Sequence, residues 1–107
     1  MENLNKISTA MGKTIQVDVE HCGLCAAHAR QCRSLQKYIM NEQPDTDLVC
    51  RAGRRGSFEV IINGMLVHSK LQTQAFPSQD DILQRVKNVH AGLPPNYVKA
   101  ENICTLM

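Results

Sequence analysis

The 107-residue sequence has no tryptophan, and aromatic residues make up only 4% of it. Single-stranded nucleic acids bind largely by stacking their bases on aromatic side chains, so this scarcity argues against that role. The sequence also has little excess of either charge, because 12 Lys and Arg against 10 Asp and Glu leave a formal net charge of +2. That excess is too small to indicate a nucleic acid or an anionic membrane surface as partner. We therefore expect no nucleic-acid partner.

Long hydrophobic runs are missing as well. No run approaches the roughly 20 apolar residues of a transmembrane helix. The first residues, Met1 to Lys6, show no basic region followed by an apolar stretch, so we expect no secretory signal. The five cysteines form an odd count, which argues against a secreted disulfide scaffold. These features predict a single cytoplasmic domain, since a domain takes roughly 150 residues.

The first half of the chain reads as a strand, a helix and a second strand. Residues 14–20 alternate between apolar and polar side chains, which predicts a strand with one buried face. A helical stripe of spacing 4, 3, 3 and 4 follows, and the helix should end near Glu42 because Pro44 disfavours helical geometry before it. The stripe consists of Cys25, Ala29, Cys32, Leu35 and Ile39. Residues 47–51 are a second candidate strand.

The second half reads as a hairpin and a helix. Asn63-Gly64 separates two strand-like runs at 58–62 and 65–70, which is a strong signal for a type I′ turn. Residues 72–76 are a predicted loop, and Ser78 is a predicted N-cap for a helix that Gly92 ends. The order β-α-β-β-β-α predicts an α/β, thioredoxin-like fold with a mixed four-stranded sheet. We place this domain at 14–92, between flexible tails at 1–13 and 93–107.

A Cys-x-x-Cys pair lies where the first strand meets the first helix. Free N–H groups and the helix dipole at such a site favour a thiolate, which is the reactive form of cysteine. Cys22 and Cys25 are therefore the predicted catalytic pair and redox disulfide. By thioredoxin logic Cys22 attacks and Cys25 resolves the mixed disulfide.

Residues around the pair suggest side chains that assist the thiol chemistry, and they also suggest a zinc site as an alternative. The candidates for binding a thiol substrate or tuning a thiolate are His21, His28, Arg54 and Arg55. The arginines would attract an anionic thiol such as glutathione, and we expect no resident cofactor and no metal. The alternative is a zinc module, because Cys22, Cys25, His28 and Cys32 have ligand-like spacings. Against it, Cys32 must face the sheet, so we interpret Cys32 and Cys50 as small core hydrophobes.

The last four residues, Cys104-Thr105-Leu106-Met107, fit the C-a-a-X prenylation pattern, in which a final Met favours farnesyl. One lipid gives marginal, reversible anchoring, and the sequence near Cys104 offers no basic cluster as a second signal. We therefore predict a lipidated Cys104 and a chain that divides between cytosol and membrane.

Two segments resemble one known family. Residues 17–25, and residues 56–71 with Phe76-Pro77, are similar to the strand-plus-CxxC opening and the hairpin of the selenoprotein W-related (Rdx-type) proteins. The resemblance covers about residues 14–91, and the prenylation-type end makes the chain most similar to the migration and invasion enhancer branch. In members with selenocysteine, selenium falls at the position of Cys25, which leaves the order of attack open.

The resemblance implies a thiol oxidoreductase or redox-regulatory domain attached to the inner face of the plasma membrane. It also implies a role in cell migration and actin-rich protrusions, with signalling or cytoskeletal partners. Two functions use the same residues: an enzyme acting on protein thiols, disulfides or glutathione, and a redox-sensing adapter without turnover. The sequence does not separate them, and we expect a monomer in either case.

Overall fold

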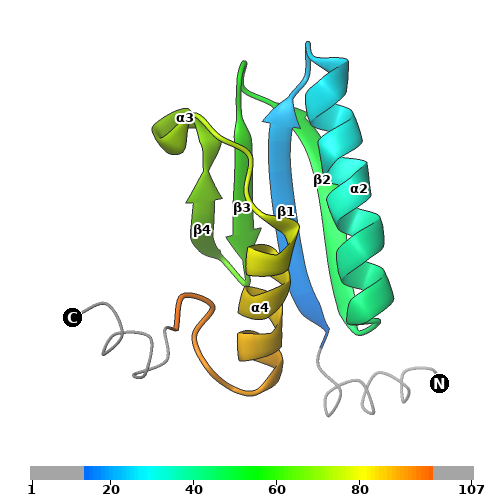
Figure 1. The fold of residues 1–107 in the computed structure, drawn as a ribbon, viewed down its shortest axis with the longest axis vertical. Helices are drawn as coiled ribbons and strands as arrows, with labels where there is room; N and C mark the ends of the chain where they lie inside the picture. The colour runs from blue at the N-terminus through cyan, green and yellow to red at the C-terminus, as the bar shows by residue number, and fades with distance from the viewer. Residues whose placement is uncertain (1–13, 98–107) are drawn as a thin grey trace, which may run out of the picture.

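The computed structural model describes residues 14–97 (Figure 1). Its elements are β1 (Ile15–Cys22), α2 (Ala26–Glu42), β2 (Thr46–Gly53), β3 (Phe58–Ile62), β4 (Met65–Ser69), α3 (Lys70–Thr73) and α4 (Gln79–His90). The predicted order of elements is confirmed, with the short helix α3 added after the hairpin. The predicted tail at 1–13, the last ten residues of the predicted tail at 93–107, and Cys104 lie outside the described residues.

The four strands form one mixed sheet in the order β2-β1-β3-β4. β1 runs parallel to β2, whereas β3 is antiparallel to both β1 and β4. The hairpin turn between β3 and β4 has Asn63 at φ 48° and Gly64 at φ 87°, the two positive values that a type I′ turn requires. The mixed four-stranded sheet predicted from the sequence is therefore present.

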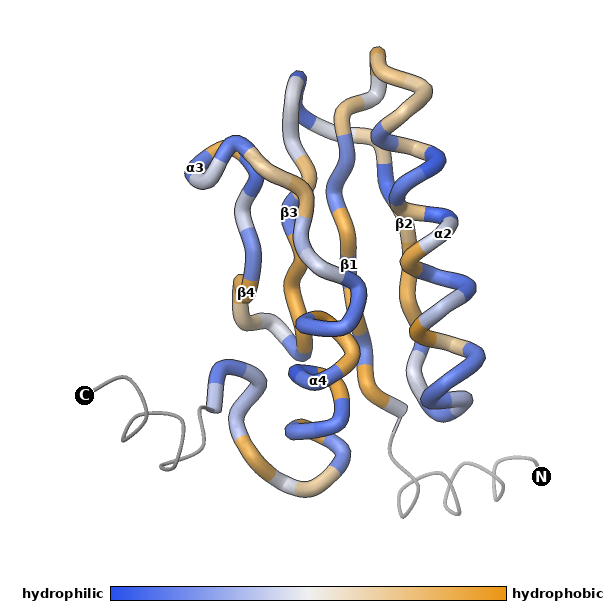
Figure 2. The backbone as a smooth tube through the Cα atoms, viewed as in Figure 1, coloured by the Kyte–Doolittle hydropathy of each residue, from blue (hydrophilic) through white to orange (hydrophobic). Residues whose placement is uncertain are grey.

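The core lies between one face of the sheet and the helices α2 and α4. The alternation of β1 directs Val17 and Val19 to this face, opposite Ile62 and Val60 of β3. Figure 2 shows the hydrophobic residues of α2 on the side toward β2 and hydrophilic ones on the side turned away. The two helices add Cys32, Leu35, Ile39, Ile82, Leu83 and Val86 to the core. The opposite face of the sheet carries polar residues such as Asp18 and Glu20.

The helix ends follow their local signals. The Ser78 hydroxyl accepts a hydrogen bond from the Asp81 amide at 3.2 Å and so caps α4, as predicted. After α4 the chain turns back, and the Asn88 side-chain amide donates to the Tyr97 carbonyl at 3.4 Å. None of the helices within residues 14–97 combines the length and the apolar character needed to cross a membrane.

Candidate functional site

Two free thiols lie at the turn between β1 and α2. Cys22 is the last residue of β1 and Cys25 is the N-cap of α2, with no side-chain cap hydrogen bond. Cys22 is buried and Cys25 is half-buried. Leu24 stands between them with 76% of its surface exposed. The thiols therefore lie at the end of the sheet where β1 and β2 finish (Figure 1), next to an apolar side chain that faces solvent.

The surroundings of Cys22 favour its thiolate. The backbone N–H groups of Gly56, Leu24 and Cys25 lower the pKa of the Cys22 thiol, and the positive charge of Arg55 adds to this effect, although burial works in the opposite direction. Gly56 is in the β2–β3 turn at φ 76°, where glycine is favoured. The turn is tied to β1 because the Cys22 amide donates to the Ser57 carbonyl at 2.9 Å. Gly56 and Ser57 were not among the residues predicted from the sequence.

An ion pair holds the same turn from the outer face of the sheet. Arg54 donates from Nε and Nη2 to the Glu20 carboxylate at 2.9 and 3.0 Å, and its backbone N–H adds a third bond at 2.6 Å. These hydrogen bonds lower the pKa of Glu20 to about 2. Gly53 leaves room for this carboxylate, because a Cβ there would overlap the Glu20 side chain. Arg54 is thus engaged by Glu20, and its predicted role toward a substrate stays a prediction.

The amide environment of Cys22 predicts the pH dependence of its reactivity. In a Cys25→Ser variant, we expect alkylation of Cys22 by iodoacetamide to rise with pH around a midpoint below the ordinary thiol pKa of about 8.5. Arg55→Gln should move that midpoint upward modestly, because Arg55 is the weakest of the favourable influences. Arg51→Gln, an exposed arginine on β2 that has no part in this pKa, is the matched control. Mass spectrometry of the Cys22 peptide measures the rates, and a midpoint at or above 8.5 contradicts the assignment.

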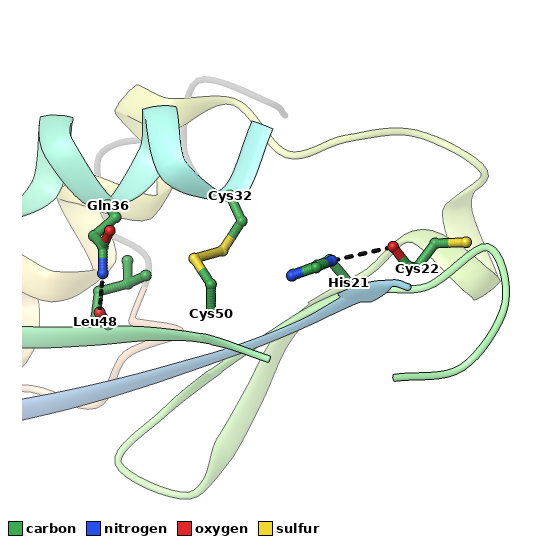
Figure 3. The surroundings of a disulfide bond; sticks show 6 residues. All are labelled: His21, Cys22, Cys32, Gln36, Leu48 and Cys50. Carbon is green, nitrogen blue, oxygen red and sulfur yellow. Dashed lines mark hydrogen bonds between the residues drawn. A yellow bond between two sulfur atoms is a disulfide. The ribbon is translucent and has the colours of Figure 1, made fainter. Parts of the chain in front are cut away.

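The two predicted histidines lie near the pair but in different settings. His28, in the first turns of α2, packs on the Phe76 ring at 4.9 Å, and both of its ring nitrogens are buried without a hydrogen-bond partner. Burial, with the charges of Lys70 and His21, lowers the pKa of His28, which favours a neutral ring. His21 Nδ1 lies 3.1 Å from the Cys22 carbonyl, so Nδ1 is the donor (Figure 3). A neutral His28 supplies no charge to a nearby thiolate.

Cys32 and Cys50 form a disulfide between α2 and β2 (Figure 3). Their interpretation as unpaired core cysteines is therefore wrong, although Cys32 is fully buried as expected. The parallel β1–β2 pairing places α2 over β2, which brings the two Cα atoms to 6.1 Å, within the range for a disulfide. The sequence predicts that Cys32 lies on the buried face of a helix and Cys50 in a strand. It does not predict that this helix face packs against that strand.

The disulfide also bears on the zinc alternative. Cys32, one of its four proposed ligands, is bonded to Cys50 and so is not a thiolate in this structure. Among residues 14–97, no group of three or more His, Cys, Asp or Glu side chains is arranged to hold a metal ion.

The sequence matches one family model and is similar to two named proteins. The model of the Rdx family matches residues 16–88. Migration and invasion enhancer 1 of Mus musculus is 32% identical over 83 residues, which are 78% of this chain and 71% of the mouse protein. The protein of the same name from Bos taurus is 31% identical over 86 residues, covering 80% and 74% of the two chains.

Two solved structures share the fold. A selenoprotein W-related protein of Vibrio cholerae matches with a TM-score of 0.63 and 21% identity, covering 73% of this chain and 99% of its own. A protein of Bordetella parapertussis matches with a TM-score of 0.63 and 18% identity, covering 70% and 96%. The thioredoxin-like fold predicted from the sequence is confirmed by the first of these likenesses.

Proposed function

Since this chain belongs to the Rdx family, whose thioredoxin-like fold supports a redox-related role, we propose that it is a thiol–disulfide oxidoreductase whose reactive pair is Cys22 and Cys25. The observation that carries the proposal is the placement of two free thiols at one strand–helix junction: Cys22 ends β1, Cys25 is the N-cap of α2, and the backbone N–H groups around Cys22 lower the pKa of its thiol. A lowered pKa enlarges the thiolate fraction at a given pH, and the thiolate is the nucleophilic form of cysteine.

The reaction transfers two electrons. The Cys22 thiolate attacks one sulfur of a substrate disulfide, and the other substrate sulfur leaves as a thiolate and takes up a proton. The Cys25 thiol then loses its proton and attacks Cys22 in the mixed disulfide. That step forms the Cys22–Cys25 disulfide and releases the second substrate thiol, so the substrate is reduced and the pair is oxidised. The reverse sequence oxidises a dithiol.

The surface around the pair suggests the substrate class. Leu24 offers an exposed apolar contact to a protein substrate, and Arg55 gives a nearby positive charge on an exposed side chain. One apolar and one cationic side chain beside the pair suit a protein disulfide or the anionic tripeptide glutathione. We assign these two as the substrate classes, with signalling or cytoskeletal proteins as the proposed protein partners.

Trapping of the mixed disulfide tests this function. A Cys25→Ser variant lacks the resolving thiol, so we expect glutathione disulfide to leave one glutathione on Cys22, stable enough for intact-mass detection. Cys22→Ser should carry no adduct at residue 25 under the same conditions. An adduct that forms on Cys25 instead would reverse the assigned order of attack, and no adduct on either cysteine would contradict the proposed activity.

We further propose that Cys104 is prenylated and holds part of the population at the cytosolic face of the plasma membrane, where the chain regulates migration and actin-rich protrusions. The support is the C-a-a-X motif and the likeness to migration and invasion enhancer proteins. In fractionated cells, Cys104→Ser should shift the membrane-bound share to the cytosol, because a single lipid is the anchor. Cys22→Ser, which leaves the motif intact, should keep the wild-type distribution. An unchanged distribution for Cys104→Ser would contradict the lipid anchor.

A further inference from the structure

The Cys32–Cys50 disulfide links α2 to β2 close to the N-terminal end of α2, where Cys25 is the N-cap. No residue of the helix before Cys32 is buried: residues 26–31 are exposed or half-buried. Cys32 itself has 0% of its surface exposed and is the first of the three buried residues of α2. The bond to Cys50 and the packing of His28 on Phe76 are therefore the contacts that hold the first turns of the helix, with Cys25 at their N-cap, and the disulfide is the covalent one.

The rest of α2 has attachments that do not depend on the bond. Leu35 and Ile39 are buried in the core, and the Gln36 side-chain amide donates to the Leu48 carbonyl at 2.7 Å (Figure 3). Two reduced thiols would occupy the same interior as small apolar groups. The fold is therefore compatible with both the oxidised and the reduced state of Cys32 and Cys50.

The bond is also separate from the Cys22–Cys25 pair. Cys32 comes seven positions after Cys25, which corresponds to about 10 Å along a helix. In Figure 3 the sulfur of Cys22 points away from the disulfide, and His21 lies between them. The helix rise between Cys25 and Cys32 and the direction of the Cys22 sulfur separate the two pairs in this structure, so we expect an external thiol to act on the disulfide. Cys50 is half-buried on the edge strand β2 and is the more accessible of the two sulfur-bearing residues.

We propose that Cys32 and Cys50 are a second redox site, whose reversible two-electron oxidation controls how firmly the N-terminal turns of α2 are held. A dithiol reductant attacks the Cys50 sulfur, and Cys32 leaves as a thiolate and is protonated. The second thiol of the reductant then releases Cys50 and becomes part of the reductant's own disulfide. Glutathione disulfide or another disulfide oxidant reverses the reaction and takes up the two electrons.

The experiment isolates this site in the full-length chain. A Cys22→Ser, Cys25→Ser, Cys104→Ser variant keeps only Cys32 and Cys50, and it is equilibrated with defined ratios of reduced and oxidised dithiothreitol. Alkylation after denaturation counts the thiols by mass. Circular dichroism reports the fold and the melting temperature, and hydrogen exchange reports residues 26–31. The same variant with Cys32→Ala and Cys50→Ala added is the control that cannot change state.

We expect one transition between unlabelled and doubly labelled chains, with the fold retained on both sides. Closure of the 18-residue separation should raise the melting temperature of the oxidised form by roughly 10 °C or more. Exchange at residues 26–31 should be faster after reduction, and the control should show neither change. The proposal is overturned if no disulfide forms at any ratio, if the bond is reduced only when the chain unfolds, or if exchange at 26–31 does not respond. Because Cys22 and Cys25 are absent, these results are independent of the proposed oxidoreductase activity.

Discussion

Replacing Cys22 by serine should lower thiol–disulfide turnover by at least about 10³-fold, the scale on which loss of a nucleophile acts in enzymes that use covalent catalysis. The hydroxyl of serine is not ionised near neutral pH, so the backbone N–H groups of Gly56 and Leu24 would have no anion to stabilise. The change is small in volume and should leave the fold intact. The loss is therefore expected in the rate of the chemical step.

Turnover of glutathione disulfide or of a protein disulfide, coupled to consumption of a reductant, measures this effect. Cys104→Ser is the matched control, since it removes a thiol outside the described residues and should leave turnover at the wild-type level. A Cys22→Ser variant that keeps more than about a tenth of the rate would rule out Cys22 as the nucleophile. A wild-type chain that shows no turnover, but binds a partner differently after oxidation, would instead identify a redox-sensing adapter.

Replacing Glu59 by alanine should cost about 3 kcal/mol of unfolding free energy, because several hydrogen-bond donors lose a buried acceptor at once. The Glu59 residue is only 4% exposed. Its carboxylate accepts the Ser69 hydroxyl, the Phe58 amide at 3.1 Å and the Leu71 amide at 3.2 Å. These bonds connect β3 to the end of β4 and the start of α3, so the loss affects the elements that follow the hairpin.

Chemical unfolding of the wild type, of Glu59→Ala and of the near-isosteric Glu59→Gln measures the cost. The exposed Glu42→Ala serves as control and should change stability by less than about 0.5 kcal/mol. The loss of unfolding free energy for Glu59→Gln should lie between those of the two alanine variants. Its amide keeps one acceptor oxygen but presents an N–H₂ group to neighbours that are themselves donors. A loss for Glu59→Ala no larger than that for Glu42→Ala would contradict the structural role of the carboxylate.

The same carboxylate predicts a pH dependence. Burial raises the pKa of Glu59, but the hydrogen bonds from Ser69, Leu71, Phe58 and Lys70 outweigh it, and the net pKa is lowered. A lowered folded-state pKa contributes stability above the unfolded value of about 4.3, and this contribution disappears as the pH falls through the folded value. The stability difference between wild type and Glu59→Gln should therefore narrow on acidification below about pH 4.

The sequence by itself determined every element except the short helix α3, and it placed the Cys22–Cys25 pair between a strand and a helix. The alternation of β1, the helical stripe of α2 and the Asn63-Gly64 turn are local patterns, and local backbone preference is enough to produce each of them. Cys22 and Cys25 follow from the same information, because the junction of a strand and a helix is fixed by the two patterns that meet there.

Tertiary structure alone decided which side chains face that pair and how the other cysteines are used. Arg54 and Glu20 are 34 residues apart, and they meet because β2 lies beside β1 in parallel register. Gly56 reaches Cys22 because the turn after β2 crosses the end of β1, and Cys32 meets Cys50 because α2 packs over β2. Each of these contacts depends on which elements become neighbours. A local residue pattern carries little of that information. It determines on which face of its own helix or strand a side chain lies, but not which other element packs against that face.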